Sequence, residues 1–426
     1  MSSELSVPGP GSPPFFYHQG VLQVEELPLT TLTAAADTPL YVYSQREITH
    51  RAAAYRDSLA AITSRGQVCY AIKANGNVAL LRLLAKLGLG ADVTSGGELF
   101  LALQAGFPTD KIVFSGVGKR REEIELALEN RIQALHVESA QELAVIGEIA
   151  AARQQMTAIT LRLNPDVPVE THPYISTGAK AHKFGVSADE LLVLAQTVAA
   201  HPWLHLTGLA IHIGSQIVEL AGFAQAVQVI LHLAQTLQAQ GIQVNYLDVG
   251  GGLGIDYSGN EPSTLPTIAD WVQTVAEPVA AAGYSVVMEP GRSIVGPAGA
   301  LITQVLYTKQ QGTHQFVITD AGMTDLIRPA LYQAHHPIWP LQPREGEPVM
   351  VNVVGPVCET GHTLARGRVL PPVQPGDYLA ILQTGAYGFA MSSNYNGRLR
   401  PAECLVNGHE WDIIRPRQTW RDLISI

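Results

Sequence analysis

A lysine stands at the end of an apolar run in the segment YAIKAN, residues 70–75. Lysine is rarely buried in a protein unless it is paired or takes part in chemistry. Lys73 can extend its amine from a strand end to solvent, which is the commoner situation for such a residue. It can also be a lysine whose amine, kept neutral by burial, attacks an aldehyde and forms an imine. The rest of the chain must decide between these interpretations.

Two glycine-containing segments later in the chain could hold a phosphate. LDVGGGLG contains Gly251 and Gly252, and MEPGRS contains Gly291 and Arg292. Glycines let backbone N–H groups approach an anion closely, although a tight turn is the commoner reason for a single glycine run. Loops at the ends of late strands are the usual phosphate site of an eight-stranded α/β barrel. The two segments together therefore favour phosphate binding.

A lysine, a phosphate site and a carboxylate together match pyridoxal 5′-phosphate (PLP). Lys73 would form the imine with the cofactor, and Glu289 would keep the pyridine nitrogen protonated, so that the ring withdraws electrons strongly. His212, in AIHIGSQ, ends another apolar run and could stack on the ring. A hydrogen-bonded core histidine is the alternative interpretation of His212. The combination predicts PLP as the cofactor, and we assign no metal ligand.

The elements that would position these residues alternate regularly between about residues 40 and 300. Short β-branched runs such as TPLYVY, QVCYAIK and GADVTS each precede an Ala/Leu-rich stretch, which is typical of βα units. About nine strand candidates fit a closed (β/α)8 barrel better than an open sheet. The unusual residues stand at the ends of these runs: Lys73, Asp92, Ser115, His136, Asn164, His212, Gly250 and Glu289. In a barrel, these ends meet on one face.

The pattern changes after about residue 300. Alternating or β-rich runs such as HQFVITDAG and DYLAILQTG are separated by Pro/Gly turns, which indicates an antiparallel β-domain. We therefore predict an α/β protein with a PLP-binding (β/α)8 TIM barrel over residues 39–300. A C-terminal antiparallel β-domain would cover residues 301–426, and the ordered part of residues 1–38 would join it.

The composition excludes several classes of protein. The chain has 426 residues, 46% of them hydrophobic, and a net charge of −10. Its charges are interspersed, without a Lys/Arg-rich run, which argues against nucleic acid as a partner. The N-terminal segment has no features of a secretory signal, and no apolar stretch reaches the ~18 residues of a membrane span. Three separated cysteines do not suggest a disulfide framework. We expect a cytoplasmic protein that binds no membrane.

Eight segments, in this order, resemble the diaminopimelate decarboxylases, a family of fold-type-III PLP enzymes of the alanine-racemase-like group. They are YAIKAN, DVTSGGEL, HIGSQI, LDVGGGLGIDY, EPGRSIV, RPALY, GPVCETGH and GAYGFAMSSNYN. The resemblance runs from about residue 15 to 415. It implies a PLP-loaded barrel, a C-terminal β-domain, and a homodimer whose active sites are shared at the subunit interface. The family reaction removes a carboxylate from the D-centre of meso-2,6-diaminoheptanedioate and gives L-lysine, the last step of lysine biosynthesis.

The resemblance also implies roles for individual residues. Lys73 would hold PLP, and Cys358 would be the acid that faces the reacting carbon across the dimer interface. Glu289 would pair with the pyridinium, and Ser215 would help to hold the phosphate. The full set of expected cofactor contacts is Lys73, Asp92, His212, Ser215, Gly251, Gly252, Glu289, Gly291, Arg292 and Tyr387.

The far end of such a substrate carries an ammonium and a carboxylate. Arginines match a carboxylate, and an acid matches an ammonium. Arg292, Arg328 and Tyr332 are candidates for the distal carboxylate. Glu359 is the candidate for the ammonium, and Tyr387 would line the substrate side. Each alone could be an ordinary surface residue whose ion pair contributes little.

The chemistry of the site favours decarboxylation over racemisation. A racemase of this fold is better served by an arginine facing the ring nitrogen, where this chain has the glutamate of MEPGR. The carbanion left by CO2 needs a proton, and Cys358 in GPVCET is a reasonable donor, although buried filler is the commoner role of a lone cysteine. A PLP carrier without chemistry is the non-enzyme alternative.

Related substrates remain an alternative within the decarboxylases: carboxynorspermidine, ornithine or arginine, a D-amino acid, or carrier-bound glutamate. Ornithine and arginine decarboxylases usually have Asp after the catalytic Cys, where this chain has Glu359, and they lack the arginine pair to which Arg328 belongs. Three residues depart from the family pattern: Thr324, His182 and His362. They bear on the loop over the active site and on affinity, not on the class of reaction.

Overall fold

A computed structural model describes residues 13–168, 183–259, 263–359 and 363–424. Of the three departures from the family pattern, His182 and His362 lie outside these ranges. The chain divides into two compact units. The barrel unit comprises Arg51–Ile255 and Thr264–Ser293. The β-domain unit comprises Met1–His50, Asp256–Ser263 and Ile294–Ile426.

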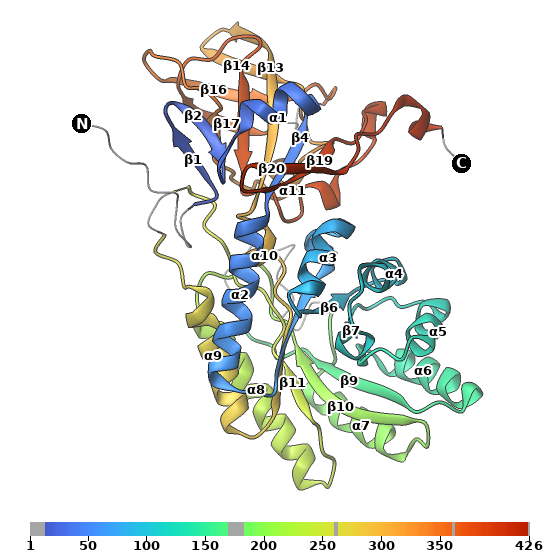
Figure 1. Ribbon diagram of the computed structural model, residues 1–426. Coiled ribbons are helices and arrows are strands. Elements are labelled where there is room, and N and C mark those ends of the chain that lie inside the picture. The colour runs from blue at the N-terminus through green and yellow to red at the C-terminus, as the bar shows by residue number, and fades with distance from the viewer. Residues whose placement is uncertain (1–12, 169–182, 260–262, 360–362, 425–426) are drawn as a thin grey trace. The chain divides into compact units, whose positions relative to one another are not determined.

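A closed barrel of eight parallel strands forms the centre of the barrel unit (Figure 1). In order around the barrel, the strands are β5 (Gly66–Ala71), β6 (Gly90–Val93), β7 (Ile112–Phe114), β8 (Ala134–Val137), β9 (Thr157–Leu163), β10 (Leu204–Ile211), β11 (Tyr246–Asp248) and β12 (Ser285–Met288). Parallel pairing of β12 with β5 closes the ring. The predicted (β/α)8 barrel is therefore confirmed.

Helices connect the barrel strands and cover the outside of the barrel (Figure 1). The helices of this part of the chain are α2 (Gln45–Ile62), α3 (Val78–Lys86), α4 (Gly96–Ala105), α5 (Arg121–Glu129), α6 (Ala140–Arg153), α7 (Ala188–Ala200), α8 (Ala221–Ala239), α9 (Ile268–Ala281) and α10 (Arg292–Val295). Several begin at a side-chain cap that satisfies free backbone N–H groups. Ser95 Oγ accepts from Glu98 N at 3.2 Å, and Ser139 Oγ accepts from Glu142 N at 3.1 Å. These caps determine the residue at which the loop after a strand ends and the next helix begins.

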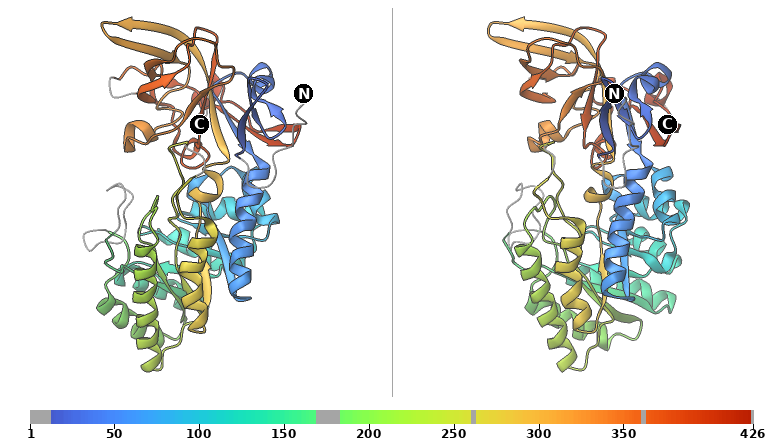
Figure 2. Two further views of the ribbon diagram at one scale, coloured as in Figure 1. Left: turned by 90° about the vertical axis from the view of Figure 1, so that its left-hand side faces the viewer. Right: turned by 60° about the vertical axis from the view of Figure 1, so that its left-hand side comes forward.

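A mostly antiparallel sheet forms the β-domain unit, in the order β17-β16-β14-β13-β4-β19-β20. Its strands are β4 (Leu40–Ser44), β13 (Gly299–Gln311), β14 (His314–Thr319), β16 (Val349–Val354), β17 (Ala365–Leu370), β19 (Ala402–Asn407) and β20 (Glu410–Arg415). β18 (Tyr378–Leu382) pairs with β13 and with β15 (Ile338–Pro340). Two pairs, β14–β16 and β4–β19, are parallel. Figure 2 shows the β13–β14 hairpin ending in a projecting tip.

Smaller elements complete the β-domain unit. They are β1 (Phe15–His18), β2 (Val21–Val24), β3 (Leu27–Pro28), α1 (Leu29–Ala36) and α11 (Arg328–Tyr332). Apolar side chains of β1, β2 and α1 pack in one core with side chains of β4, β13, β18 and β19. The described part of residues 1–38 thus lies in this unit.

The strand at residues 40–44 differs from its prediction. The sequence places TPLYVY at the start of the barrel, but β4 pairs antiparallel with β13 and parallel with β19 in the β-domain unit. All five of its residues are buried. A strand buried on both faces has the same uninterrupted apolar sequence in a parallel barrel and in the middle of another sheet, so hydrophobic periodicity cannot distinguish the two.

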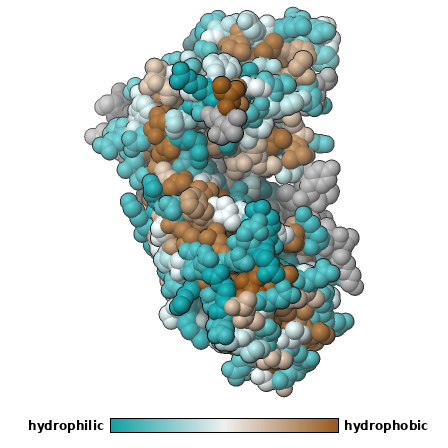
Figure 3. All heavy atoms as spheres, turned by 90° about the vertical axis from the view of Figure 1, so that its right-hand side faces the viewer, coloured by the Kyte–Doolittle hydropathy of each residue, from teal (hydrophilic) through white to brown (hydrophobic). Residues whose placement is uncertain are grey.

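The surface of the barrel unit mixes apolar and polar side chains. On the face drawn in Figure 3, brown apolar patches are interrupted by teal hydrophilic side chains. The larger exposed apolar side chains of this unit are Phe100, Val117, Met156 and Val193. Among the described residues, no helix combines the length and the apolar character needed to cross a membrane.

Candidate active site

Lys73 lies just beyond the carboxyl end of β5, in a short 3-10 turn from Ile72 to Ala74. Its Nζ is 2.8 Å from Asp92 Oδ2, on the neighbouring strand β6. The Lys73 side chain is 36% exposed, whereas Asp92 is fully buried. The amine is therefore held at the end of the barrel that carries the active sites of this architecture, where it can still be reached from outside.

A buried carboxyl pair lies near this end of the barrel. Asp248 ends β11, and Glu289 directly follows the neighbouring strand β12. Desolvation is the main cause that raises the pKa of Asp248 to about 7, and Asp92 adds to the shift. Desolvation, followed by the charges of Asp248 and Asp92, raises the pKa of Glu289 well above its ordinary value. A carboxylate here would gain much from a cationic partner.

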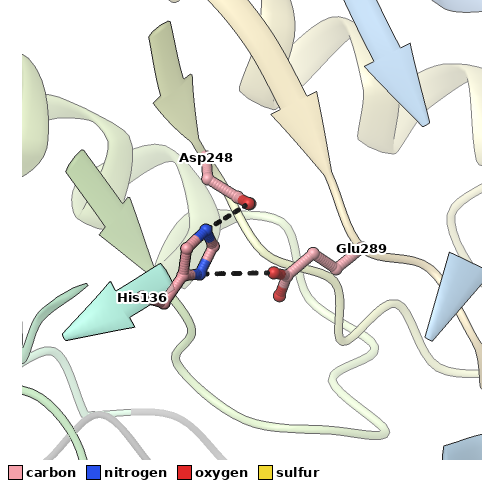
Figure 4. A group of neighbouring side chains, drawn as sticks. All are labelled: His136, Asp248 and Glu289. Carbon is pink, nitrogen blue, oxygen red and sulfur yellow. Dashed lines mark ion pairs between the residues drawn. The ribbon is translucent and has the colours of Figure 1, made fainter. Parts of the chain in front are cut away.

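His136, on β8, lies between the two carboxyl groups (Figure 4). Its Nε2 is 3.8 Å from Asp248 Oδ2, and its Nδ1 is 3.8 Å from Glu289 Oε1. Ser115 Oγ lies 3.2 Å from the same Nδ1 and donates to Glu289 Oε1 at 3.4 Å. Burial, followed by the charges of Lys119, Arg162 and Lys73, lowers the pKa of His136 well below its ordinary value. The imidazole is therefore neutral.

The glycines of LDVGGGLG are required by close packing. A Cβ on Gly251 would lie 2.2 Å from the carbonyl oxygen of Glu289, and one on Gly252 would lie 2.2 Å from that of Gly214. Gly252 also has a φ of +105°, which side chains other than glycine rarely allow. The loop after β11 thus packs directly against the loops after β10 and β12, as a two-loop anion cradle requires.

His212 and Ser215 occupy the loop after β10. The backbone N–H of Gly251 donates to His212 Nδ1 at 3.3 Å, so the neutral ring carries its proton on Nε2. Burial, with Arg162 and Lys73, lowers the pKa of His212 well below its ordinary value. A neutral ring in this place is suited to stacking on a flat cofactor.

Arg292 lies at the start of α10 and reaches Ser215. Its Nε and Nη2 donate to Ser215 Oγ at 3.3 and 3.1 Å, and the residue is only 6% exposed. Gly291 packs against the end of β5 and the turn that follows it, because a Cβ on Gly291 would lie 3.0 Å from the Cβ atoms of Ala71 and Ala74. The loops after β10, β11 and β12 therefore bring a guanidinium, a hydroxyl and glycine backbone into one small region.

The remaining predicted residues belong to the β-domain unit. Arg328, at the start of α11, is buried; its Nη1 lies 2.8 Å from His336 Nε2, and its guanidinium lies over the Tyr257 ring at 4.7 Å. His336 Nδ1 lies 2.9 Å from Leu382 O, so this nitrogen donates to the carbonyl and Nε2 accepts from the arginine. Tyr332 ends the same helix. These contacts fix the direction of the arginine.

Three predicted residues lie in loops of the same unit. Cys358 and Glu359 are exposed, and the Cys358 N–H donates to Asn396 Oδ1 at 3.1 Å. Tyr387 has a φ of +58°. A bulky residue in this left-handed region costs energy, and such strained residues tend to cluster at functional sites.

Several residues of both units are not predicted by the motifs. The sequence indicates Ser115 and His136 only as residues at strand ends, and no role is predicted for Asp248, Tyr257 or His336. The signal for His136 is a histidine inside a fully buried strand, and the signal for Asp248 is an acid directly before the glycine run. Thr324, a departure from the family pattern, is buried and donates to Asp325 Oδ2 at 3.2 Å.

A family model matches much of the chain. Residues 45–296 match the family described as pyridoxal-dependent decarboxylase, pyridoxal binding domain. A diaminopimelate decarboxylase of Aquifex aeolicus is 44% identical over 410 residues, with 96% of each chain covered. One of Pseudomonas aeruginosa is 43% identical over 411 residues, which are 96% of this chain and 98% of that protein.

The chain belongs to the diaminopimelate decarboxylase family.

Solved structures of this family have the same fold. The Helicobacter pylori diaminopimelate decarboxylase, crystallised with L-lysine, has a TM-score of 0.88 and 40% identity, covering 93% of this chain and 98% of that one. The M. jannaschi diaminopimelate decarboxylase has a TM-score of 0.92 and 35% identity, covering 96% of each chain. A lysine/ornithine decarboxylase of Vibrio vulnificus is 21% identical with a TM-score of 0.78, which is a likeness of fold alone.

The site in the barrel unit fits the pyridoxal cofactor of the diaminopimelate decarboxylase family. Lys73 offers an amine, and the loops after β10, β11 and β12 bring Ser215, Arg292 and closely packed glycine backbone together. Glu289 is a buried acid that a protonated ring nitrogen would stabilise. Asp92 Oδ1 and Asp248 Oδ2 are buried without a hydrogen-bond partner among the described residues. The match to the pyridoxal-dependent decarboxylase family and the related diaminopimelate decarboxylases confirm the predicted cofactor, PLP.

Proposed function

We propose that this PLP-dependent carboxy-lyase removes CO2 from the D-centre of meso-2,6-diaminoheptanedioate and releases L-lysine. The observation that carries the proposal is the site geometry: an amine, an anion cradle and a buried acid at one barrel end. The relatives of 43–44% identity over nearly the whole chain are named for this reaction. When bound, PLP withdraws electrons from the bond to the departing carboxylate.

The barrel unit would hold the cofactor. Lys73 would attach to its aldehyde, and Asp92 would hold the amine in place before attachment. The Glu289 carboxylate would accept a hydrogen bond from the protonated ring nitrogen, and His212 would lie against the ring. Ser215, Arg292 and the backbone of Gly251, Gly252 and Gly291 would bind the phosphate, because together they supply a hydroxyl, a cation and N–H donors.

The β-domain unit would supply the groups for the substrate. Arg328 would bind the distal carboxylate, since a guanidinium fixed by His336 and Tyr257 loses little freedom on binding. Tyr332 would assist it, as would Arg292 of the barrel unit, and Glu359 would bind the distal ammonium. Tyr387 would line the cofactor and the substrate.

Cys358 would protonate the carbon that has lost CO2. Its thiol is exposed in a loop, as expected for a residue that acts on a substrate and not as core filler. By resemblance to the family, we infer that Cys358 acts in the site of the partner subunit of a homodimer. We also infer that the enzyme acts in the cytoplasm.

Product analysis tests the choice of substrate. Purified protein reconstituted with PLP is incubated separately with the meso, LL and DD isomers of diaminoheptanedioate, and with carboxynorspermidine, ornithine, arginine, D-amino acids and carrier-bound glutamate. Mass spectrometry should detect lysine and CO2 only from isomers that contain a D-centre. Turnover of one of the other compounds without turnover of the meso isomer would contradict the proposal and identify the alternative substrate.

A further inference from the structure

Two carboxyl groups and a histidine form a closed group inside the barrel. Asp248 and Glu289 come from the adjacent positions β11 and β12, and His136 comes from β8, across the barrel. One oxygen or nitrogen of each residue lies within 4.8 Å of the others, and all three residues are buried. Figure 4 shows the imidazole between the two acids, with one ring nitrogen toward each.

Ionising both carboxyl groups at once would cost much free energy. Two like charges at this separation in a buried site favour one shared proton, which belongs to the pair and not to one residue. Desolvation and the charge of neighbouring acids raise the pKa of both carboxyl groups, that of Asp248 to about 7, which favours one proton on the pair at neutral pH. Which acid carries it matters for the proposed function, because only an ionised Glu289 can pair with a protonated ring nitrogen.

The contacts of His136 indicate which of its ring nitrogens donates a hydrogen bond and which accepts one. A neutral imidazole has one donor and one acceptor nitrogen. Nδ1 is at hydrogen-bond distance from Ser115 Oγ, and that hydroxyl donates to Glu289 Oε1. If Nδ1 carries the proton, Nε2 is an acceptor facing Asp248 Oδ2.

The shared proton can lie between Asp248 Oδ2 and His136 Nε2. His136 Nε2 and Asp248 Oδ2 both lack a hydrogen-bond partner among the described residues. Their separation of 3.8 Å is longer than a hydrogen bond, and catalytic hydrogen bonds often shorten only when the ligand binds. A proton on Asp248 Oδ2 would satisfy both atoms at once.

We propose that His136 is a positioning residue that places the shared proton on Asp248 and leaves Glu289 ionised toward the ring nitrogen of the cofactor. Proton and charge balance: the pair keeps one proton and one negative charge, and the imidazole stays neutral. The inference rests on the proposed function, because it needs PLP in the site. Other titratable and charged groups that act on the three residues are Lys73, Asp92, Lys119, Arg162, Cys69 and Tyr246.

The test measures protonation of the ring nitrogen directly. Holoenzyme is prepared with PLP carrying ¹⁵N in its ring, and the ¹⁵N chemical shift is followed against pH. In His136→Leu, the midpoint for loss of the ring proton should fall by about one pH unit or more, which is a tenfold or larger change in the equilibrium. Val137→Ala, at the next buried position of the same strand, controls for weakened packing and should leave the midpoint unchanged.

A second variant separates the proposed arrangement from its opposite. Asp248→Asn imitates the protonated acid: its oxygen can still accept from Gly250 N, and its amide can donate to His136 Nε2. It should keep the midpoint within a few tenths of a pH unit of the unchanged protein. If the histidine instead carried the proton as a cation between two carboxylates, Asp248→Asn would lower the midpoint as much as His136→Leu.

The midpoints of the two variants together support or overturn the role of His136. A lowered midpoint in His136→Leu together with an unchanged one in Asp248→Asn supports the proposal. An unchanged midpoint in His136→Leu, or equal falls in both variants, overturns it. If His136→Leu does not fold, a lowered midpoint in Asp248→Asn still overturns the proposal, because asparagine should imitate the protonated acid. Protein that does not bind PLP contradicts the proposed function itself, whereas a normal holoenzyme with an unmoved titration overturns only the role of His136.

Discussion

The amine of Lys73, just beyond the end of β5, and the carboxylate of Asp92, on the neighbouring strand β6, are 2.8 Å apart. The carboxylate is buried and the lysine is partly exposed, so that the amine is held in one place at the open end of the barrel.

Replacement of Lys73 by alanine should abolish covalent attachment of the cofactor. Holoenzyme is treated with borohydride, digested, and mapped by mass spectrometry. The unchanged protein should carry the reduced adduct on the peptide of Lys73, whereas Lys73→Ala should carry none and lose its visible absorption band. Lys86→Ala, at an exposed position at the end of α3, should retain both. An adduct on another lysine would show that the attachment site is wrongly assigned.

Gly251→Ala should weaken cofactor binding at least about tenfold, or ~1.4 kcal/mol. The new Cβ would lie 2.2 Å from the Glu289 carbonyl oxygen, so the loops after β11 and β12 would have to separate. Titration of the apoprotein with PLP, followed by absorbance, gives the Kd. Gly97→Ala is a matched control in α4, where the added Cβ finds its nearest neighbour at 3.7 Å. Equal Kd values for both variants would argue against a cradle at Gly251.

Arg328→Ala should raise KM for the meso isomer while the cofactor spectrum stays the same. A hydrogen bond to a charged group contributes about 1.5–3 kcal/mol, so we expect a rise of about 10- to 100-fold. Arg344→Ala removes an exposed arginine that pairs with Asp377 and should leave KM unchanged. If Arg328→Ala lowered kcat with no change in KM, a role in binding the distal carboxylate would be excluded.

Cys358→Ala should keep the cofactor band and lose most of the turnover, about 100-fold or more, because general acid catalysis commonly contributes that much. Rates are compared per mole of bound PLP. Cys404→Ala changes a buried cysteine of the β-domain unit and should lower stability without changing this specific rate. A Cys358→Ala enzyme with full activity would remove this thiol from the reaction.

Asp325 should make the protein less stable as the pH rises. Burial raises the pKa of Asp325 from 3.8 to about 6. Because the folded state holds the proton more tightly, the stabilisation is complete below about pH 4 and is lost as the pH passes 6. By linkage, this difference amounts to ~3 kcal/mol. Asp325→Asn should therefore raise the urea midpoint relative to the unchanged protein at pH 7.5 but not at pH 4.

A control of opposite sign is available for this pH effect. The Arg344 hydrogen bond holds the pKa of Asp377 below its ordinary value, so its contribution is present above that ordinary value and is lost as the pH falls. Asp377→Asn should therefore lower the urea midpoint at pH 7.5 more than at low pH. A parallel pH dependence in the two variants would show that the Asp325 carboxyl is not the cause.

The sequence was sufficient to predict where the residues of short motifs lie in the fold. Lys73, Glu289 and the glycines each stand in a stretch whose composition indicates a loop after a strand, and the barrel brings those stretches together. The contact between His136 and Asp248 could not be predicted in the same way, because it depends on the side-chain directions of β8 and β11, two strands that are not neighbours in the barrel. The strained backbone of Tyr387 has no sequence signal, since tyrosine does not favour a positive φ.

Strand β4 shows a second limit of what the sequence can predict. Residues 40–44 predict a buried strand, which is correct, but they do not say which sheet it joins. Its neighbours β13 and β19 lie far along the chain, and local periodicity contains no information on such distant pairing.

The pairing of β4 with β13 has a consequence for biosynthesis. Tyr43 lies opposite Gly299, so about 250 residues must leave the ribosome between one partner and the other, and closing so long a loop is slow. All eight barrel strands are made in that interval. The barrel can thus mature while β4 still exposes its backbone N–H and C=O groups, and this early strand is where a nascent chain would need protection from aggregation.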